Sequence, residues 1–278
     1  MSRILIIGDS AGEGEWGFLC QEHKVVKSVC GCPKKDKSFS FIEEGELYGV
    51  THRGLEKYLL DYGCYVKNYS MGACSNHTAL RLLGDTVDAH TFDYIFWFVT
   101  DPLRDITHNP NVPLKAKDAI EMEFIIDRYM IRSLERASHL AETKNVKIHI
   151  IGGFYSPKLE HIAMFKNIHI ACHNLLKLLS TKSLPDDFHG YSTLPWKLQK
   201  NKFVDTSQWC LEEGAIDYLE STYNTFLKIM ADLPYEYVVN KGEDVGEGRW
   251  RDVHVNRVAH KVLFDHLCET FNFTAYNC

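Results

Sequence analysis

The chain has 278 residues, of which 45% are hydrophobic and 24% are charged, proportions typical of a folded globular protein rather than a disordered one. Its 31 basic and 37 acidic residues give a net charge of −6, which argues against sequence-independent nucleic-acid binding because that binding depends on neutralised phosphates. No apolar run approaches the ~20 residues that cross a bilayer, so we expect no membrane partner.

The first residues and the cysteines indicate the compartment. The chain opens Met-Ser-Arg and enters an apolar run at Ile4, which is too short a leader for a signal peptide, so a cytoplasmic location is expected. The nine cysteines are odd in number and show no framework spacing, which favours reduced thiols. Cys30 and Cys32 form a Cys-Gly-Cys pair, but no second pair of ligands follows at zinc-site spacing. We therefore expect neither a metal nor an organic cofactor.

Four short apolar runs have the pattern of strands buried in a parallel sheet. They cover residues 4–7, 64–71, 94–99 and 146–151. The run at 94–99 is continuous rather than alternating, which favours a core strand over a surface for stacking.

Helical periodicity follows these runs. The predicted helices are 49–60, 76–83, 117–142, 156–180, 212–230 and 255–271, with Ser75 suited to cap the second of them. His169 and His173 would then stand about one turn apart on one helix face. No Glu follows His169 as in a metallopeptidase helix, so we interpret the two as a solvated pair.

Strands that alternate with helices predict an α/β fold, a three-layer α/β/α sandwich around a mostly parallel sheet. We expect one domain over residues 1–278, with large irregular loops at about 11–45 and 181–210. Loops of this length in a compact domain are usually functional.

Polar clusters follow three of the predicted strands, at the edge where parallel sheets bind ligands. These clusters are Gly8-Asp9-Ser10, Gly72 to Asn76 and Thr100-Asp101, and a fourth, Asp252-Val253-His254, precedes the last helix. A serine hydroxyl needs an imidazole to take its proton, and the imidazole needs a carboxylate to fix its tautomer. Ser10, His254 and Asp252 are therefore the candidate nucleophile, base and orienter. The structural alternatives are a helix cap for Ser10 and a surface position for His254.

These residues resemble the SGNH hydrolases, also called GDSL-type hydrolases, a family of esterases, lipases and deacetylases with a flavodoxin-like fold. The run from Ile4 to Ser10 looks like the first block of the family, whose Ser is the nucleophile and donates its amide to the oxyanion. The run from Asn68 to Asn76 is similar to the second block, which implies Gly72, or else Ala73, as a second amide donor. The run from Asp252 to Arg257 looks like the fifth block, in which the catalytic His opens the last helix.

The sequence departs from the family pattern at two places. The family has Gly-x-Asn-Asp after the third strand, with the Asn as third oxyanion donor, whereas this chain has Phe98-Val99-Thr100-Asp101-Pro102, without an Asn. Thr100 and Asn76 are the candidate replacements, and an ionised Asp101 in the site would oppose a developing oxyanion. The family acid stands three residues before the His, where this chain has Arg251, so Asp252 is displaced by one residue and Asp244 is an alternative orienter.

One rival motif points to another function. The run from Gly12 to Gly17 matches the Gly-x-Gly-x-x-Gly fingerprint of dinucleotide-binding proteins. It begins several residues after the strand, no helical pattern follows it, and Glu13 and Glu15 would place negative charge beside a pyrophosphate. These features disfavour a dinucleotide site.

The sequence thus predicts a serine esterase or deacylase that works through an acyl-enzyme. We expect a small-molecule or glycan ester as substrate, such as an O-acetyl group on a carbohydrate, bound by Asp101, Trp16 and Trp209, with Trp196 as a further aromatic side chain. The alternatives are an acyltransferase that uses the same residues and a non-catalytic binding or structural relative. The sequence leaves the oligomeric state open.

Overall fold

A five-stranded parallel sheet forms the centre of the molecule. The computed structural model describes residues 1–19, 39–43, 46–72, 74–107, 113–153, 155–184, 188–189, 209–237 and 255–275. The central strands are β1 (Arg3–Ile7), β5 (Tyr65–Asn68), β6 (Tyr94–Val99), β8 (Ile148–Gly152) and β9 (Ile168–Cys172), in the order β5-β1-β6-β8-β9. Numbered within the sheet, this is the order 2-1-3-4-5 of flavodoxin-like folds, so the predicted fold class is confirmed.

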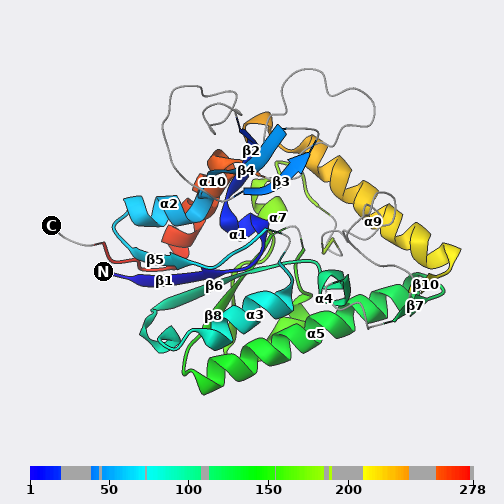
Figure 1. Ribbon diagram of the computed structural model, residues 1–278, viewed down its shortest axis with the longest axis horizontal. Helices are drawn as coiled ribbons and strands as arrows, with labels where there is room; N and C mark the ends of the chain where they lie inside the picture. Colours follow the sequence, from blue (N-terminus) through cyan, green and yellow to red (C-terminus); the bar gives the residue numbers. More distant parts are fainter. Residues whose placement is uncertain are drawn as a thin grey trace.

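Helices cover both faces of the sheet and complete three layers (Figure 1). The helices α3 (Asn76–Asp85) and α5 (Ala119–Thr143) contribute to the core on one face, and α2 (Gly54–Asp61), α7 (Leu175–Leu179) and α10 (Arg257–Thr270) to the core on the other. The residues of β1 alternate between these cores, because successive side chains of a strand point to opposite faces. Every residue from Ile4 to Ile7 is fully buried, which explains why the strand reads as a continuous apolar run.

Smaller elements surround this sandwich. Near the carboxyl end of β1, the strands β2 (Glu15–Leu19), β4 (Glu46–His52) and β3 (Phe39–Glu43) form an antiparallel sheet in that order. The strands β7 (Leu114–Ala116) and β10 (Trp209–Leu211) pair in parallel. The remaining elements are α1 (Ser10–Glu13), α4 (Leu103–Thr107), α6 (Leu159–Ala163), α9 (Glu213–Asp232) and the 3-10 turns η2 (Ala89–Thr91) and η3 (Tyr235–Tyr237). No helix in the described ranges has the length and apolar character to cross a membrane.

Most of the predicted elements are confirmed, with shifts of a few residues at their ends. This holds for the four predicted strands and for the helices predicted at 76–83, 117–142, 212–230 and 255–271. The cap predicted at Ser75 is also confirmed, since its hydroxyl accepts from the Thr78 amide at 3.2 Å.

Two helix predictions are corrected by the structure. The helix expected over 156–180 is instead α6, the strand β9 and α7, because Ile168 to Cys172 pairs with β8 as the edge strand of the sheet. His169 therefore lies on a strand and His173 after it, so the two do not share a helix face. The helix expected from residue 49 begins at Gly54, because the preceding residues belong to β4.

The segment predicted as an irregular loop at 11–45 contains α1, β2 and β3 in its described parts. In the segment predicted at 181–210, the described residues include the start of β10. The Gly-rich fingerprint from Gly12 to Gly17 lies on α1 and β2, and a strand rather than a helix follows Gly14. A dinucleotide fingerprint requires the glycines to open a helix, so this geometry contradicts the rival motif.

Two histidines lie side by side near the amino end of the central sheet. His149 on β8 is in register with His169 on β9, and their ring centroids are 5.5 Å apart. Phe271 packs edge-on against His149 with centroids 4.9 Å apart. His149 is 9% exposed, and burial, followed by the charge of His169 and of Lys147, lowers its pKa to about 4. The folded protein therefore holds His149 in its neutral form.

We expect the free energy of unfolding to fall as pH drops from about 6.5 to about 4, because the unfolded chain protonates His149 in this window and the folded chain does not. A pKa lowered from 6.5 to about 4 corresponds to at most about 3 kcal/mol. Urea unfolding of wild type and of His149→Phe at several pH values measures this effect. The difference between the two proteins should grow below pH ~6.5, and parallel curves would contradict the assignment.

Candidate active site

Ser10 stands at a sharp turn where β1 ends and α1 begins. Gly8 has φ +147°, and a side chain on it would lie 2.6 Å from Cβ and the carbonyl oxygen of Phe98 on β6, so only glycine fits between the two strands. Asp9 caps α1 by accepting a hydrogen bond from the Ala11 amide at 3.0 Å. Ser10 is thus the first residue of α1 and is 6% exposed. Asp9 therefore has a structural role, in which it holds the turn by accepting a backbone amide.

The turn lies at the switch point of the sheet. The strands β1 and β6 are neighbours, while the connections that leave them run to opposite sides. In this strand order a crevice opens at the carboxyl ends of those two strands, and ligands bind there. Ser10 follows β1, and Thr100 and Asp101 follow β6. The fold therefore brings the first and third predicted clusters to the edge where a site is expected.

The second cluster packs against the first. Gly12 O accepts from the Asn68 side chain at 2.9 Å, and Gly8 O accepts from the Met71 amide at 3.1 Å. The Gly72 amide, the predicted second oxyanion donor, donates to the carboxylate of Glu13 at 2.7 Å. The hydrogen bond of the predicted donor is therefore already accepted by the carboxylate of Glu13 on α1. Ala73, the alternative donor, lies outside the described residues.

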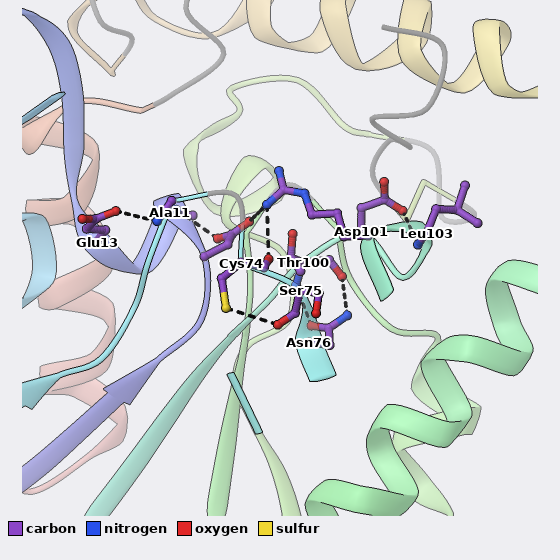
Figure 2. Close-up of polar contacts among 11 residues, drawn as sticks. Ala11, Glu13, Cys74, Ser75, Asn76, Thr100, Asp101 and Leu103 are labelled. Carbon is purple, nitrogen blue, oxygen red and sulfur yellow. Dashed lines mark hydrogen bonds and ion pairs between the residues drawn. The ribbon is translucent and has the colours of Figure 1, made fainter. Parts of the chain in front are cut away.

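Asn76 joins the second cluster to the third. Its side-chain N–H donates to the Thr100 carbonyl at 2.8 Å, and its side-chain oxygen accepts from the Thr100 amide at 3.0 Å. Asn76 is fully buried and Thr100 is 4% exposed. Figure 2 shows Asn76 beside Thr100, with Asp101 and Leu103 following on the same loop. The side-chain amide of Asn76 therefore bonds to both the backbone carbonyl and the backbone N–H of Thr100. An oxyanion role for Asn76 or Thr100 stays a prediction.

Asp101 opens α4. Its carboxylate accepts from the Leu103 amide at 2.9 Å, and the residue is 4% exposed. One turn later, Arg104 reaches back across the loops: Nη1 donates to Asp9 at 3.0 Å and to the Cys74 carbonyl at 3.5 Å. Arg104 was not among the site residues predicted from the sequence. Its only signal is a basic residue three positions after Asp101, on a helix that starts at the edge where the polar clusters meet.

Acidic side chains and a thiol surround this arginine. Burial, and then the charge of Asp9, raises the pKa of the Cys74 thiol to about 12. Burial also raises the pKa of Asp105 on α4, whose carboxylate accepts from the His77 amide at 2.8 Å and from the Ser133 hydroxyl at 3.2 Å. The Cys74 thiol is therefore protonated at neutral pH and is not a nucleophile.

The chain returns to this edge just before α10. Arg257 binds the carboxylate of Glu15 on β2 through its backbone amide at 2.6 Å, Nε at 3.1 Å and Nη2 at 2.9 Å. The Glu15 side chain is only 9% exposed. Val255 is fully buried and belongs to the same apolar cluster as Ala11 on α1. These contacts hold the start of α10 beside the turn that carries Ser10.

Several predicted site residues lie outside the described part of the chain. They are Asp252, His254, Asp244 and Trp196. Trp16 is described only as a backbone position of β2, whereas Trp209 on β10 is half-buried against the core that contains α5. The Cys30–Cys32 pair is also outside, and the described residues contain no group of three or more side chains placed to hold a metal ion.

Comparison with known proteins gives weak structural likenesses. No family model and no curated protein matches the chain. A lipase/acylhydrolase from Enterococcus faecalis is 11% identical with a TM-score of 0.36, covering 97% of this chain and 95% of that one. A member of the lipolytic G-D-S-L family from Veillonella parvula is 12% identical with a TM-score of 0.38, covering 99% and 100%. A mutant of Axe2, an acetylxylan esterase from Geobacillus stearothermophilus, is 10% identical with a TM-score of 0.36, covering 100% and 97%.

The protein from Veillonella parvula belongs to the G-D-S-L family, which is the family that the motifs resemble. Because the TM-scores lie below 0.5, the function proposed below depends on the residues and geometry of this chain alone.

Removing the Asn76 side chain should destabilise the protein. In Asn76→Ala, the buried amide and carbonyl of Thr100 lose their partners, and each such loss costs about 1–3 kcal/mol. We expect the free energy of unfolding to fall by about 2–4 kcal/mol in chemical denaturation. Asn224→Ala, an exposed position on α9, should change it by less than about 0.5 kcal/mol. Equal effects of the two substitutions would show that the Asn76 bridge does not hold the loops.

Proposed function

We propose that the chain is a carboxylic ester hydrolase with Ser10 as nucleophile, His254 as general base and Asp252 as the group that orients the imidazole. One observation carries the proposal: Ser10 opens a helix at the switch point of the sheet, and Arg257, three residues after His254, binds the carboxylate of Glu15, five residues after Ser10. Val255, which directly follows His254, belongs to the same apolar cluster as Ala11, which directly follows Ser10. This supports a position of His254 near the Ser10 turn, because consecutive Cα atoms are only 3.8 Å apart.

The reaction would proceed in two half-reactions. The Ser10 oxygen attacks the ester carbonyl while its proton passes to His254, and collapse of the tetrahedral intermediate breaks the bond to the alcohol, which leaves with that proton. Water then attacks the acyl-enzyme, with His254 taking its proton, and the carboxylic acid is released. The Ser10 amide belongs to the first turn of α1, where backbone N–H groups point out of the helix and carry its positive dipole end. This amide is the first donor to the oxyanion.

A small acyl ester, such as an O-acetyl group on a carbohydrate, is the substrate class we propose to test first. Trp16 and Trp209 are the aromatic side chains assigned to contact a sugar ring, and Asp101 the polar group. Transfer of the acyl group to an alcohol instead of water would use the same residues.

A second candidate is a binding protein that holds an ester or glycan without turning it over. Two observations favour it: the Gly72 amide already donates to the carboxylate of Glu13, and the loop after β6 carries the buried Asp101 and no Asn. Both features place negative charge where an oxyanion would form.

A fluorophosphonate probe distinguishes the two candidates. The wild type should gain the mass of one probe less HF, because the serine oxygen displaces the fluoride, and Ser10→Ala and His254→Ala should gain none, because only an activated serine reacts. Ser133→Ala is the matched control, since Ser133 is 7% exposed and Ser10 6%, and it should still be labelled. Absence of labelling in the wild type, together with no hydrolysis of nitrophenyl acetate or acetylated sugars, would support the binding protein instead.

Glu13→Gln should make the esterase faster. The substitution keeps an acceptor of the same shape for the Gly72 amide and removes the negative charge that competes with the oxyanion for it. We expect kcat/KM for nitrophenyl acetate to rise about fivefold, which corresponds to the difference of about 1 kcal/mol between charge-assisted and neutral hydrogen bonds. Glu135→Gln, an equal change of charge at an exposed position of α5, should leave it unaltered. A decrease for Glu13→Gln would mean that Glu13 serves to hold the loop and that Gly72 does not bind the oxyanion.

A further inference from the structure

Arg104 connects three loops that are far apart in the sequence. Its guanidinium Nη1 lies 3.0 Å from the Asp9 carboxylate, in the turn after β1, and 3.5 Å from the Cys74 carbonyl, in the loop after β5. Arg104 itself is on α4, which follows β6. The side chains of Arg104 and Asp9 are 10% and 3% exposed, so this ion pair is buried.

The pair controls the position of the turn that contains Ser10. One carboxylate oxygen of Asp9 accepts from the Ala11 amide at 3.0 Å, and the other accepts from Arg104. Both oxygens are therefore committed, and the side chain cannot rotate without losing a buried charge-assisted bond. Because the Ala11 amide belongs to the first turn of α1, any movement of Asp9 is passed to Ser10, the residue between them in the chain.

The charge of Arg104 is needed at this edge as much as its geometry. The carboxylates of Asp9 and Asp101 are both almost completely buried there. Without the guanidinium bound to Asp9, these two carboxylates would oppose the negative charge that develops in acyl transfer. Stability alone does not explain the pair, since buried ion pairs are often no more stabilising than apolar residues of the same volume.

We propose that Arg104 is a positioning residue of the Ser10 site, which fixes the turn through Asp9 and offsets the carboxylate charge next to the oxyanion. This inference rests on the proposed function. In this role Arg104 acts through Asp9 and does not touch the substrate.

The test compares kcat and KM for nitrophenyl acetate among variants of the full chain. Arg104→Gln should lower kcat about 10²-fold with KM within about threefold of wild type, because charge and alignment matter mainly in the transition state. Arg104→Lys, which keeps the charge, should lose less than about tenfold. The double variant Asp9→Asn with Arg104→Gln removes the Asp9 charge that Arg104→Gln leaves unpaired, and it should have a higher kcat than Arg104→Gln alone.

A destabilised control separates positioning from general loss of structure. Met130→Ala opens a cavity in the fully buried part of α5, and its Tm should fall while its kcat stays within about twofold of wild type. If Arg104→Gln does not fold, Arg104→Lys and the double variant carry the comparison. The proposal is overturned if an active wild type keeps its kcat in Arg104→Gln, or if Lys does not rescue it, or if Met130→Ala loses kcat equally. A wild type that neither reacts with the fluorophosphonate nor hydrolyses esters would overturn the proposed function itself.

Discussion

The carboxylate of Asp9 is the contact on which the geometry of the candidate site depends. The strands β1, β6 and β8 are buried almost throughout, so the polar groups of the loops that follow them must satisfy one another instead of water. Asp9 does this for the turn after β1, by binding the Ala11 amide on one side and Arg104 on the other. Asn76 does the same for the loop after β6 by pairing with both backbone groups of Thr100. These contacts connect segments that the chain order separates, and they fix the loops as a unit.

The strand order explains why Ser10 stands where these contacts converge. Placing β1 between β5 and β6 sends the two connections to opposite faces, which makes the carboxyl ends of β1 and β6 the switch point of the sheet. The small antiparallel sheet that contains β2 adds a second constraint, because Glu15 on β2 binds Arg257 at the start of α10. A residue 242 positions away is thereby held at the same edge. The first and last parts of the chain thus meet at one place in the fold.

The sequence was sufficient for the sandwich because its strands and long helices carry their own patterns. Ile4 to Ile7 and Tyr94 to Val99 are continuous apolar runs, and α5 repeats its buried residues at helical spacing. The strand β9 was missed, because it is flanked by short helices and its Ile and His residues fit either period until pairing with β8 is known. The residues from Gly8 to Ser10 and from Gly72 to Asn76 could be assigned to one edge, but their partners could not. Arg104 has no local pattern, and its role depends on a carboxylate 95 positions earlier in the chain.

The segment from Thr100 to Arg104 is best understood as one unit. The Asp101 carboxylate is bound by the Leu103 amide in the first turn of α4, and the guanidinium that leaves the same turn binds the carboxylate of Asp9. An apolar residue in place of Arg104 alone would leave the Asp9 carboxylate buried and unpaired, whereas apolar residues in place of both partners could be as stable as the pair. Stability alone therefore does not require this ion pair, and its presence at the residue before Ser10 favours a site whose electrostatics matter. In this arrangement the segment after β6 keeps one acid at the edge and supplies the counter-charge for another.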